Sequence, residues 1–576
     1  MKTPLNLDTA DRQAFGPSYD RPSDLPVPTG EGLPTCLVLP PHPVWEGNVL
    51  DWTADPFQDR NWQFQHHTLR WINPLRWAAL EGDALARKQW LRVARSWFEN
   101  NVPAARAQNP FAWKDMADGN RAIQLSIGAR LVSDNDMWWY VEALEYHRAW
   151  LMDEAHIVGK NHGLHQHAGL LVVSAVLGDE TGMATAMSRM AQQFDSTFDE
   201  QGTNDEGSAA YHQMNLRWWA QSWHRVELEG IQIPGWVAQR LDAAGAVLAH
   251  LAQPDGRLPQ IGDSARGPVS RGLHPESDFV ATVGRDGRKP QGNVMVLERG
   301  YVLSRSGWGE TRPMRMESHM VLRHGHDLKA HSHDDRGSVH VYAGGRPWLV
   351  DGGFHSYQTK DPTRQYLHSR EAHNVASLVG VDHHAKNPVD LLRHEVTPDV
   401  HDFELADRGY HHHEIRRRAL YFTEPDCWIV WDHTPSTTAA PLEQAWHVDH
   451  GISVTRHDRG YELRDGTRFL TMSWLGTLPQ LRLHRATEGD LRGWVGTRWK
   501  TLLPGSRITA QASPHIHRNV VLIAPQGDFP LGIVRSYITT AGTLEAAVNR
   551  GADTWRVTVK PGAARAVKFS PGTNRG

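Results

Sequence analysis

The chain has 576 residues, more than one hydrophobic core usually serves, so two or three domains are expected. Hydrophobic residues at 40% and charged residues at 22% are typical of a globular protein and exclude a disordered one. The 61 basic and 65 acidic side chains leave a formal charge of −4, which argues against a nucleic-acid partner. The sequence shows no membrane span and no signal peptide, so it predicts a cytoplasmic protein, or the trimmed mature form of a periplasmic or secreted one.

Two residue types are unusually frequent, with 24 Trp and 35 His. Most of the Trp are expected in the core, but an exposed indole offers a flat apolar face suited to a sugar ring. Cys36 and Cys427 are the only cysteines, which excludes a disulfide scaffold and leaves their pairing open.

Residues 1–50 are rich in Pro and Gly and lack periodicity, which predicts an extended arm on the surface. From 51 to 290 apolar residues recur three and four apart, and Gly or Pro separates the segments. Repeated helices without strands between them predict helical hairpins stacked into a closed or incomplete (α/α) toroid. The clearest helices are expected at Asp83–Asn101, Asp136–Met152, His162–Gly178 and Ser208–Leu228.

The period changes near residue 295. Segments such as RGSVHVYAGGRPWLVDGG and RALYFTEPDCWIVWDHT alternate or run apolar over strand lengths, and Gly, Asp and Pro turns separate them. Residues 291–576 are therefore expected to form a large antiparallel β-sandwich. The predicted fold class is α+β and multidomain, a toroid followed by a sandwich, with the ligand site in a cleft where the two meet.

One segment carries the residue types of a metal site. His331 and His333 are two apart on an expected strand, so their side chains would share one face. Asp351 ends an apolar strand, and His373 follows it. Two histidines and one carboxylate, His333, Asp351 and His373, suit zinc and leave a fourth position for water. The alternative is that these are ordinary hydrogen-bonded histidines.

Two polar motifs lie in the helical half. NHGLHQHAG places Asn161 as the expected N-cap of a helix, followed by His162, with His165 at the surface or lining a cleft. The alternative is a cap with incidental histidines. NDEGSAAYH places Tyr211 in a first helical turn, where a phenol facing a cleft can transfer a proton. The alternative is a packed tyrosine with a bonded hydroxyl.

Asp263, in LPQIGDSA, is expected to be structural and to orient the floor of the cleft. The sequence lacks GxSxG, GxxxxGK[ST], HExxH and a GxGxxG after a strand, which argues against the chemistries those motifs carry. A glycosidase with paired carboxylates stays open.

Taken in order, NHGLHQHAGLL, DEGSAAYH, LPQIGDSA, HSHDDRGSVHVYAGGRPWLVDGG and SREAHNVASL resemble the heparinase II/III group of polysaccharide lyases, which is also similar to certain alginate lyases. The resemblance runs from about 160 to 380. It implies an incomplete α/α toroid joined to antiparallel sheets. It also implies β-elimination at a uronic acid of a glycosaminoglycan-like or alginate-like polysaccharide, which leaves an unsaturated uronate end.

The resemblance also implies roles for single residues. Asn161 and His162 match the pair that handles the uronate carboxylate and the C5 proton, Tyr211 matches the catalytic tyrosine, and His331 matches the catalytic histidine. His333, Asp351 and His373 match the ligands of a metal, zinc by preference and structural rather than catalytic. Residues expected to contact the substrate are Arg364, Tyr366, Tyr357 and His165.

Several points stay open at this stage. Tyr211 is expected to protonate the leaving oxygen, and the base is Tyr211 itself, His162 or His331, depending on the uronate epimer. The absent signal peptide indicates degradation of imported oligosaccharides or a role inside a polysaccharide-producing cell. The slightly negative charge argues against heparin itself and leaves less sulfated glycosaminoglycans or alginate-like uronans open. Endo or exo mode and oligomeric state, monomer or dimer, are undecided. Competing functions are a non-catalytic protein that binds acidic carbohydrates and a glycoside hydrolase on the same scaffold.

Overall fold

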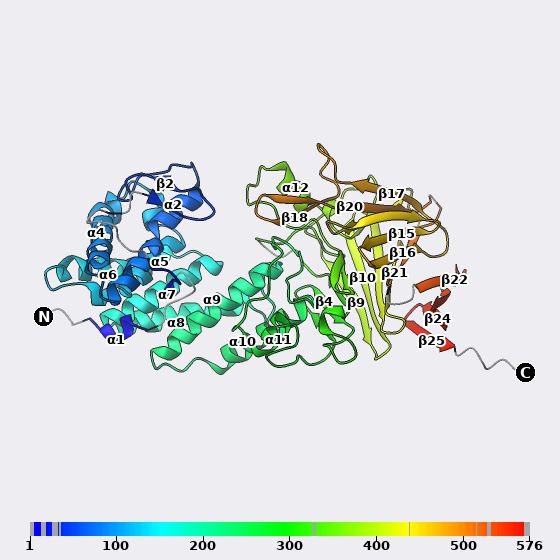
Figure 1. Ribbon diagram of the computed structural model, residues 1–576, viewed down its shortest axis with the longest axis horizontal. Helices are drawn as coiled ribbons and strands as arrows, with labels where there is room; N and C mark the ends of the chain where they lie inside the picture. Colours follow the sequence, from blue (N-terminus) through cyan, green and yellow to red (C-terminus); the bar gives the residue numbers. More distant parts are fainter. Residues whose placement is uncertain are drawn as a thin grey trace, which may run out of the picture. The chain divides into compact units, whose positions relative to one another are not determined.

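The computed structural model describes residues 5–12, 19–25, 33, 36–326, 330–436, 438–513, 515–526 and 531–569, apart from the side chains of Lys160 and Asn161. The chain divides into two compact units. The first comprises Met1–Thr197 and Asn215–Gln239, and the second comprises Phe198–Met214 and Arg240–Gly576. In Figure 1 the helices of the first unit are coloured blue to cyan, and the strands of the second are green to red.

Helices build the first unit, and their starts follow local capping chemistry. Asp59 and Asp83 accept backbone N–H groups at the starts of α2 and α4. The buried faces are rich in tryptophan, with Trp90 and Trp97 fully enclosed. The elements of this unit are α1 (Leu7–Ala10), β1 (Cys36–Leu37), β2 (Trp45–Glu46), α2 (Arg60–His67), η2 (Arg70–Ile72), α3 (Asn73–Leu80), α4 (Ala84–Asn101), η3 (Ala104–Arg106), η4 (Pro110–Trp113), α5 (Met116–Ser126), η5 (Ala129–Leu131), α6 (Met137–Met152), η6 (Glu154–His156), α7 (Lys160–Leu177) and α8 (Glu180–Thr197).

Two helices, α9 (Ala209–Leu228) and α10 (Gly235–Leu251), are divided between the units. The four helices that periodicity predicted are α4, α6, α7 and α9, each within two residues of the expected bounds. One cap was assigned wrongly. The helix α7 begins at Lys160, so Gly159 is its N-cap and Asn161 lies inside the first turn.

Antiparallel strands form most of the second unit, as the change of period predicted. Within the described residues, two large sheets hold eight and nine strands. The nine-stranded sheet contains β17 (Gln480–Arg485), β20 (Ser506–Gln511), β13 (Leu442–Val448), β7 (Arg346–Leu349), β6 (Val339–Ala343), β5 (His319–Arg323), β4 (Tyr301–Arg305) and β3 (Val294–Leu297) in that order, with β8 (Ala376–Leu378) beside β13. The eight-stranded sheet runs β14 (Ser453–His457), β15 (Gly460–Asp465), β16 (Arg468–Trp474), β21 (Arg518–Pro525), β12 (Cys427–His433), β11 (His413–Phe422), β10 (Val400–Tyr410) and β9 (Val389–Val396).

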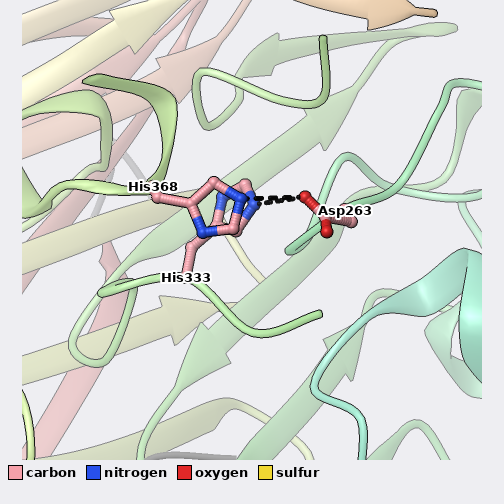
Figure 2. Close-up of side chains that lie close together, drawn as sticks. All are labelled: Asp263, His333 and His368. Carbon is pink, nitrogen blue, oxygen red and sulfur yellow. Dashed lines mark hydrogen bonds and ion pairs between the residues drawn. The ribbon is translucent and has the colours of Figure 1, made fainter. Parts of the chain in front are cut away.

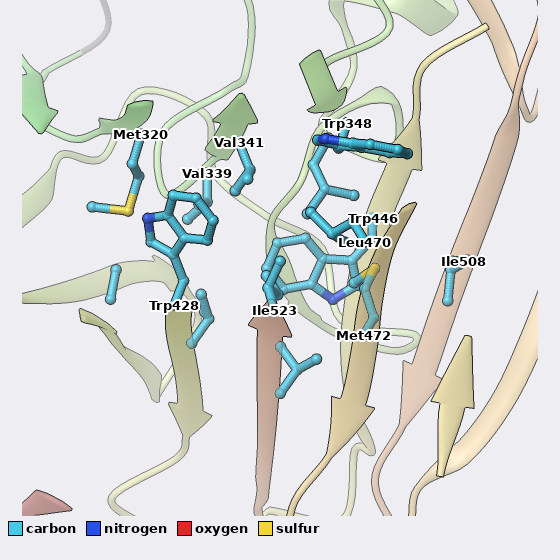
Figure 3. Packing of buried hydrophobic residues seen from close by; sticks show 14 of the residues in the cluster. Met320, Val339, Val341, Trp348, Trp428, Trp446, Leu470, Met472, Ile508 and Ile523 are labelled. Carbon is cyan, nitrogen blue, oxygen red and sulfur yellow. The ribbon is translucent and has the colours of Figure 1, made fainter. Parts of the chain in front are cut away.

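The facing sides of these two sheets enclose the main core. Trp348 and Trp446 come from the nine-stranded sheet, and Trp428 and Ile523 from the eight-stranded one; all four are buried in one cluster (Figure 3). Because side chains alternate along a strand, each strand sends every second residue into this core.

A third sheet was not predicted from the sequence. It covers the other face of the eight-stranded sheet, where Leu420, Ile429 and Leu522 pack with Leu544 and Val557 of the added layer. Both faces of β11, β12 and β21 are therefore buried, which is why RALYFTEPDCWIVWDHT reads as an apolar run and does not alternate. This third sheet has four strands, β22 (Leu531–Ile538), β23 (Leu544–Arg550), β24 (Asp553–Lys560) and β25 (Ala563–Phe569), in that order. The remaining elements are the pair β18 (Trp494–Arg498) and β19 (Thr501–Pro504), α11 (Pro275–Ala281), α12 (Pro362–His368), η7 (Met314–Met316) and η8 (Arg370–Ala372).

Three further expectations meet the structure here. The chain changes from helix to strand between α11 and β3, close to the domain boundary predicted at 290. The two compact units divide the chain at other residues. The predicted domain boundaries at 50 and 290 therefore stay predictions. Cys36 and Cys427 are both free thiols. None of the helices in the described part of the chain combines the length and apolarity needed to cross a membrane.

A buried charge network anchors the segment that follows the two histidines of HSH. His383 lies 3.2 Å from Asp334 through Nδ1 and 3.2 Å from Asp407 through Nε2, and Arg370 also pairs with Asp407. Burial lowers the pKa of His383, but the hydrogen bonds with the two carboxylates outweigh burial and raise the pKa above its usual 6.5. The folded protein therefore favours protonated His383.

This network predicts a pH-dependent stability. A raised folded pKa adds stability that is complete below about pH 6.5 and is lost as the pH rises through the folded value. His383→Gln should lower the unfolding free energy by about 1–3 kcal/mol at low pH and flatten this dependence. Urea denaturation of both proteins at pH values below and above 6.5 measures this dependence. His384→Gln is the control, because the His384 side chain is exposed. An unchanged pH dependence in His383→Gln would contradict the assignment.

Candidate active site

Asp263 is a buried carboxylate on which three histidines converge. His333 and His368 each place Nε2 3.0 Å from Oδ1, and His331 places Nδ1 3.0 Å from Oδ2. Figure 2 shows the imidazoles of His333 and His368 side by side, both directed at Asp263; their ring centroids are 3.9 Å apart. Arg364 adds two contacts of 3.2 and 3.3 Å to the same carboxylate. Residues from three separate segments therefore meet at Asp263, all within the second unit.

The surroundings of Asp263 keep it ionised. Burial alone would raise the pKa of this carboxyl, but hydrogen bonds from His331, His333 and His368 outweigh burial and hold the pKa well below its usual range. Asp263 is thus a fixed negative charge at neutral pH, and it can only accept hydrogen bonds.

The ionised carboxylate decides which ring nitrogens carry protons. His331 donates through Nδ1 and His333 through Nε2, so in the neutral rings His331 Nε2 and His333 Nδ1 hold the lone pairs. The predicted strand at these residues was wrong, because His331 and His333 lie in irregular backbone between β5 and β6. The irregular backbone still lets both rings reach one carboxylate, each at a different oxygen.

Tyr211 stacks on His331. It lies in the first turn of α9, its ring centroid is 3.4 Å from that of His331, and the planes are inclined by 12°. Its hydroxyl is 2.8 Å from the hydroxyl of Tyr357, and Tyr357 in turn packs on Phe354 and Trp499. Burial, the Tyr357 phenol and the negative charge of Asp263 all raise the pKa of Tyr211 far above its usual value. Tyr211 is therefore a neutral phenol with a proton to donate.

The predicted metal ligands are buried, and two of them have unused nitrogens. His333 Nδ1 and His373 Nε2 have no hydrogen-bond partner, and their ring centroids are 5.5 Å apart. The Nδ1 of His373 is 2.8 Å from the carbonyl oxygen of Ser369, so Nε2 keeps its lone pair. Asp351 accepts hydrogen bonds from Ser338 at 2.6 Å and from His340 at 2.8 Å.

A second grouping of possible ligands shares His333. In the part of the chain that the structure describes, the one set of three such residues whose ligand atoms lie within 4.8 Å of one another is Asp263, His333 and His368. The predicted set of His333, Asp351 and His373 is not brought to that spacing. His333 is common to both sets and would serve each through a different ring nitrogen.

The motif in the helical half lies in the first unit. His162 Nδ1 is 2.6 Å from Asp115 Oδ1, and Asp115 is the N-cap of α5 with a φ of 64°, a strained value for a residue other than Gly. His165 is buried and not at the surface; burial, followed by the charges of Arg70 and His162, lowers its pKa to about 3. The side chain of Asn161 lies outside the described residues.

Two of the expected substrate contacts also have defined surroundings. Arg364 donates to the carbonyl oxygen of Ser356 as well as to Asp263, so it acts as a counter-charge in this structure. The hydroxyl of Tyr366 is buried without a hydrogen-bond partner, and burial raises its pKa to about 12.

Sequence reasoning missed His368 and treated Asp263 as structural only. A signal for His368 existed, since Arg364 and His368 are four residues apart in α12 and so share one face of that helix. No signal marked Asp115, whose backbone conformation is visible only in the structure.

Comparison with known proteins identifies the family. A family model described as heparinase II/III N-terminus matches residues 39–273, and one described as heparinase II/III-like, C-terminal, matches residues 300–495. The chain belongs to the heparinase II/III-like family. This match confirms the family resemblance that the sequence motifs predicted, and with it the enzyme class of polysaccharide lyase. No curated protein matches the sequence.

Solved structures resemble this heparinase II/III-like protein over nearly its whole length. A mutant of the heparan sulfate lyase HepC from Pedobacter heparinus is 16% identical with a TM-score of 0.77, covering 96% of this chain and 93% of that one. A heparinase III gene product is 15% identical with a TM-score of 0.73, covering 91% and 87%. A further heparinase III is 16% identical with a TM-score of 0.70, covering 90% and 85%. These likenesses confirm the predicted fold class of a helical toroid followed by antiparallel sheets.

Proposed function

We propose that this lyase cleaves an unsulfated or lightly sulfated glycosaminoglycan by β-elimination at its uronic acid. The observation that carries the proposal is the neutral phenol of Tyr211 stacked on His331, whose ring tautomer the hydrogen bond to Asp263 fixes. The resembling structures include one named as a heparan sulfate lyase. The chain's formal charge of −4 favours a substrate with few sulfates over heparin itself.

The elimination can be assigned to these side chains. Nε2 of His331 accepts the C5 proton, the C5 electron pair forms the C4–C5 double bond, and the C4–O4 bond breaks. Tyr211 donates its proton to the leaving oxygen. The Tyr357 hydroxyl, 2.8 Å away, lies where it can restore that proton. The raised pKa of Tyr211 favours the acid role for it, and so a histidine as base.

The remaining site residues follow from the family resemblance. Asn161 and His162 would neutralise the uronate carboxylate and so stabilise the enolate that forms as the C5 proton leaves. Arg364, Tyr366, Tyr357 and His165 remain the proposed substrate contacts. The domain limits of 1–50, 51–290 and 291–576 are part of the same proposal.

The test is a panel of polysaccharides followed by ultraviolet absorbance. Hyaluronan, unsulfated and sulfated chondroitin, heparan sulfate, heparin and alginate are each incubated with the protein. We expect the absorbance of an unsaturated uronate to rise most with the least sulfated glycosaminoglycans. Saturated products, heavier by one water on mass spectrometry, would identify a hydrolase, and saturable binding without any product would identify a binding protein.

We further propose that zinc binds at His333, Asp351 and His373 in a structural role. The support is the pair of buried lone pairs, His333 Nδ1 and His373 Nε2, which nothing else in the described chain engages. A histidine that binds a metal usually donates its other N–H to a carboxylate or a carbonyl, and here His333 donates to Asp263 and His373 to Ser369. When bound, zinc would brace the loop that carries His331.

Two histidine substitutions distinguish this metal set from the alternative one. Elemental analysis of protein purified without chelator should give about one zinc per chain. His373→Asn should lose the metal and His368→Asn should keep it, because only His373 belongs to the proposed set. The opposite result would assign the metal to Asp263, His333 and His368, and metal-free wild-type protein would remove both assignments.

A further inference from the structure

A pocket opens on the outer face of the eight-stranded sheet, where that sheet extends beyond the four-stranded sheet that covers it. We call it the outer-face pocket, and it is lined by Arg416, Trp431, His433, Thr434 and Arg518, among others. Its volume is about 500 Å³, within the usual range for sites that hold a small ligand. It is separate from the site at His331, which belongs to a loop of the other large sheet.

Strand register builds the floor of the outer-face pocket. Arg416 on β11, His433 on β12 and Arg518 on β21 are directly opposite one another, and Arg418 and Trp431 form the next row on the same face. Directly opposed residues in antiparallel strands point to the same side of the sheet, so these side chains project together.

Turns of the four-stranded sheet complete the rim. Gly542, between β22 and β23, and Pro561 with Gly562, between β24 and β25, line the pocket. Gly542 has a φ of 73° and Gly562 a φ of 74°, with no atom near the position of an added Cβ. The rim is therefore bare backbone, and the chemistry of the pocket comes from the floor.

The floor holds buried polar atoms without hydrogen-bond partners. They are Trp431 Nε1, His433 Nδ1 and Thr434 Oγ1, and the whole Thr434 residue is only 7% exposed. Each such atom costs about 1–3 kcal/mol when it is left unpaired. Turning of the His433 or Thr434 side chain towards the pocket would bring such an atom to a ligand with hydroxyl or amide groups.

One positive charge in the outer-face pocket is not balanced. Arg418 donates twice to Asp402, and Arg416 pairs with Glu414. The pocket's one carboxylate, on Glu404, is 3.7 Å from Arg393 and from Arg416. Arg518 has no hydrogen bond or ion pair from its side chain within the described chain. The pocket thus offers a single free guanidinium beside a half-buried indole.

We propose that the outer-face pocket binds an oligosaccharide with one carboxylate per repeat, as a second carbohydrate site away from the reacting residues. A sugar ring packs on Trp431, and the carboxylate pairs with Arg518. One free charge suits a uronate chain better than a densely sulfated one. The identity of this oligosaccharide as a piece of the enzyme's own substrate rests on the proposed function. The preference of the pocket for a sugar with a carboxylate does not.

Calorimetry with an unsulfated tetrasaccharide of alternating glucuronate and N-acetylglucosamine tests the proposal. The full-length Tyr211→Phe protein is used so that the ligand is not cleaved. We expect two binding sites, and Arg518→Gln or Thr434→Val added to it should weaken one of them about tenfold or more. Arg565→Gln, an exposed arginine on β25, is the matched control and should leave both sites unchanged.

Two results would overturn the proposal: no site in the parent protein whose binding Arg518→Gln weakens, or equal binding of a neutral tetrasaccharide at the pocket. A single site that Arg518→Gln weakens would support the pocket and count against the proposed function instead. Circular dichroism shows whether each variant is folded, and kcat/KM on a short substrate should be the same in Arg518→Gln as in wild type. If no polysaccharide is cleaved, the proposed function fails; loss of binding in Arg518→Gln would still support the pocket.

Discussion

Tyr211→Phe is expected to reduce lyase activity by about a thousandfold or more while leaving the fold intact. The substitution removes only the hydroxyl, and general acid catalysis by a positioned group contributes about 10²–10⁴ in rate. The ring stays to stack on His331 at the same place. The loss should therefore appear in kcat, measured by the ultraviolet absorbance of the unsaturated product.

A matched control separates this effect from a general loss of stability. Tyr537 is 50% exposed on β22, and Tyr537→Phe should keep full activity. Tyr357→Phe gives an intermediate test, because it removes the hydroxyl that bonds to Tyr211 and leaves the acid itself in place. Retained activity in Tyr211→Phe with an intact thermal transition would refute the acid role.

The helices could be predicted from the sequence because their signals are local. Asp83 caps α4, and a left-handed Gly178 ends α7, so each boundary is set by residues next to it. The third sheet had no such signal. The last strand, β25, is largely exposed and lacks a clear apolar face. In β24, Trp555, Val557 and Val559 alternate with polar residues and mark a buried face, but this pattern does not tell which surface that face packs on.

The candidate site could be predicted from the sequence only in part, for a different reason. The spacing of His331 and His333 suggested a shared strand face, whereas the structure holds both rings on one carboxylate in a loop. That carboxylate, Asp263, is 68 residues from His331 and 105 from His368 along the chain. Spacing within a motif cannot reveal a partner at such a distance, so the sequence predicted only a structural role for Asp263.

Asp263→Asn is the substitution with the widest expected consequences. Asparagine keeps the shape of the side chain but removes the charge, and its amide nitrogen presents protons where His331, His333 and His368 also present theirs. Asp263 touches no reacting atom in the proposed elimination, so it is a positioning residue. We expect kcat to fall by about 10³–10⁴, the scale seen when an aspartate that fixes a catalytic histidine's tautomer is replaced by asparagine.

The same change should also destabilise the second unit by about 3–5 kcal/mol, because Arg364 and the imidazoles lose a buried counter-charge. If Asp263 had only a structural role, stabilising conditions that restore the fold of Asp263→Asn would also restore its activity. A positioning role predicts that folded Asp263→Asn stays inactive, with a large fall in kcat, a smaller change in KM and an altered dependence of kcat on pH.

The control for this experiment is Asp242→Asn, since Asp242 pairs with His274 at 2.9 Å through an exposed carboxylate. Wild-type kcat in folded Asp263→Asn would mean that His331 does not need its Nδ1 proton held, and the assignment of His331 as base would fail with it.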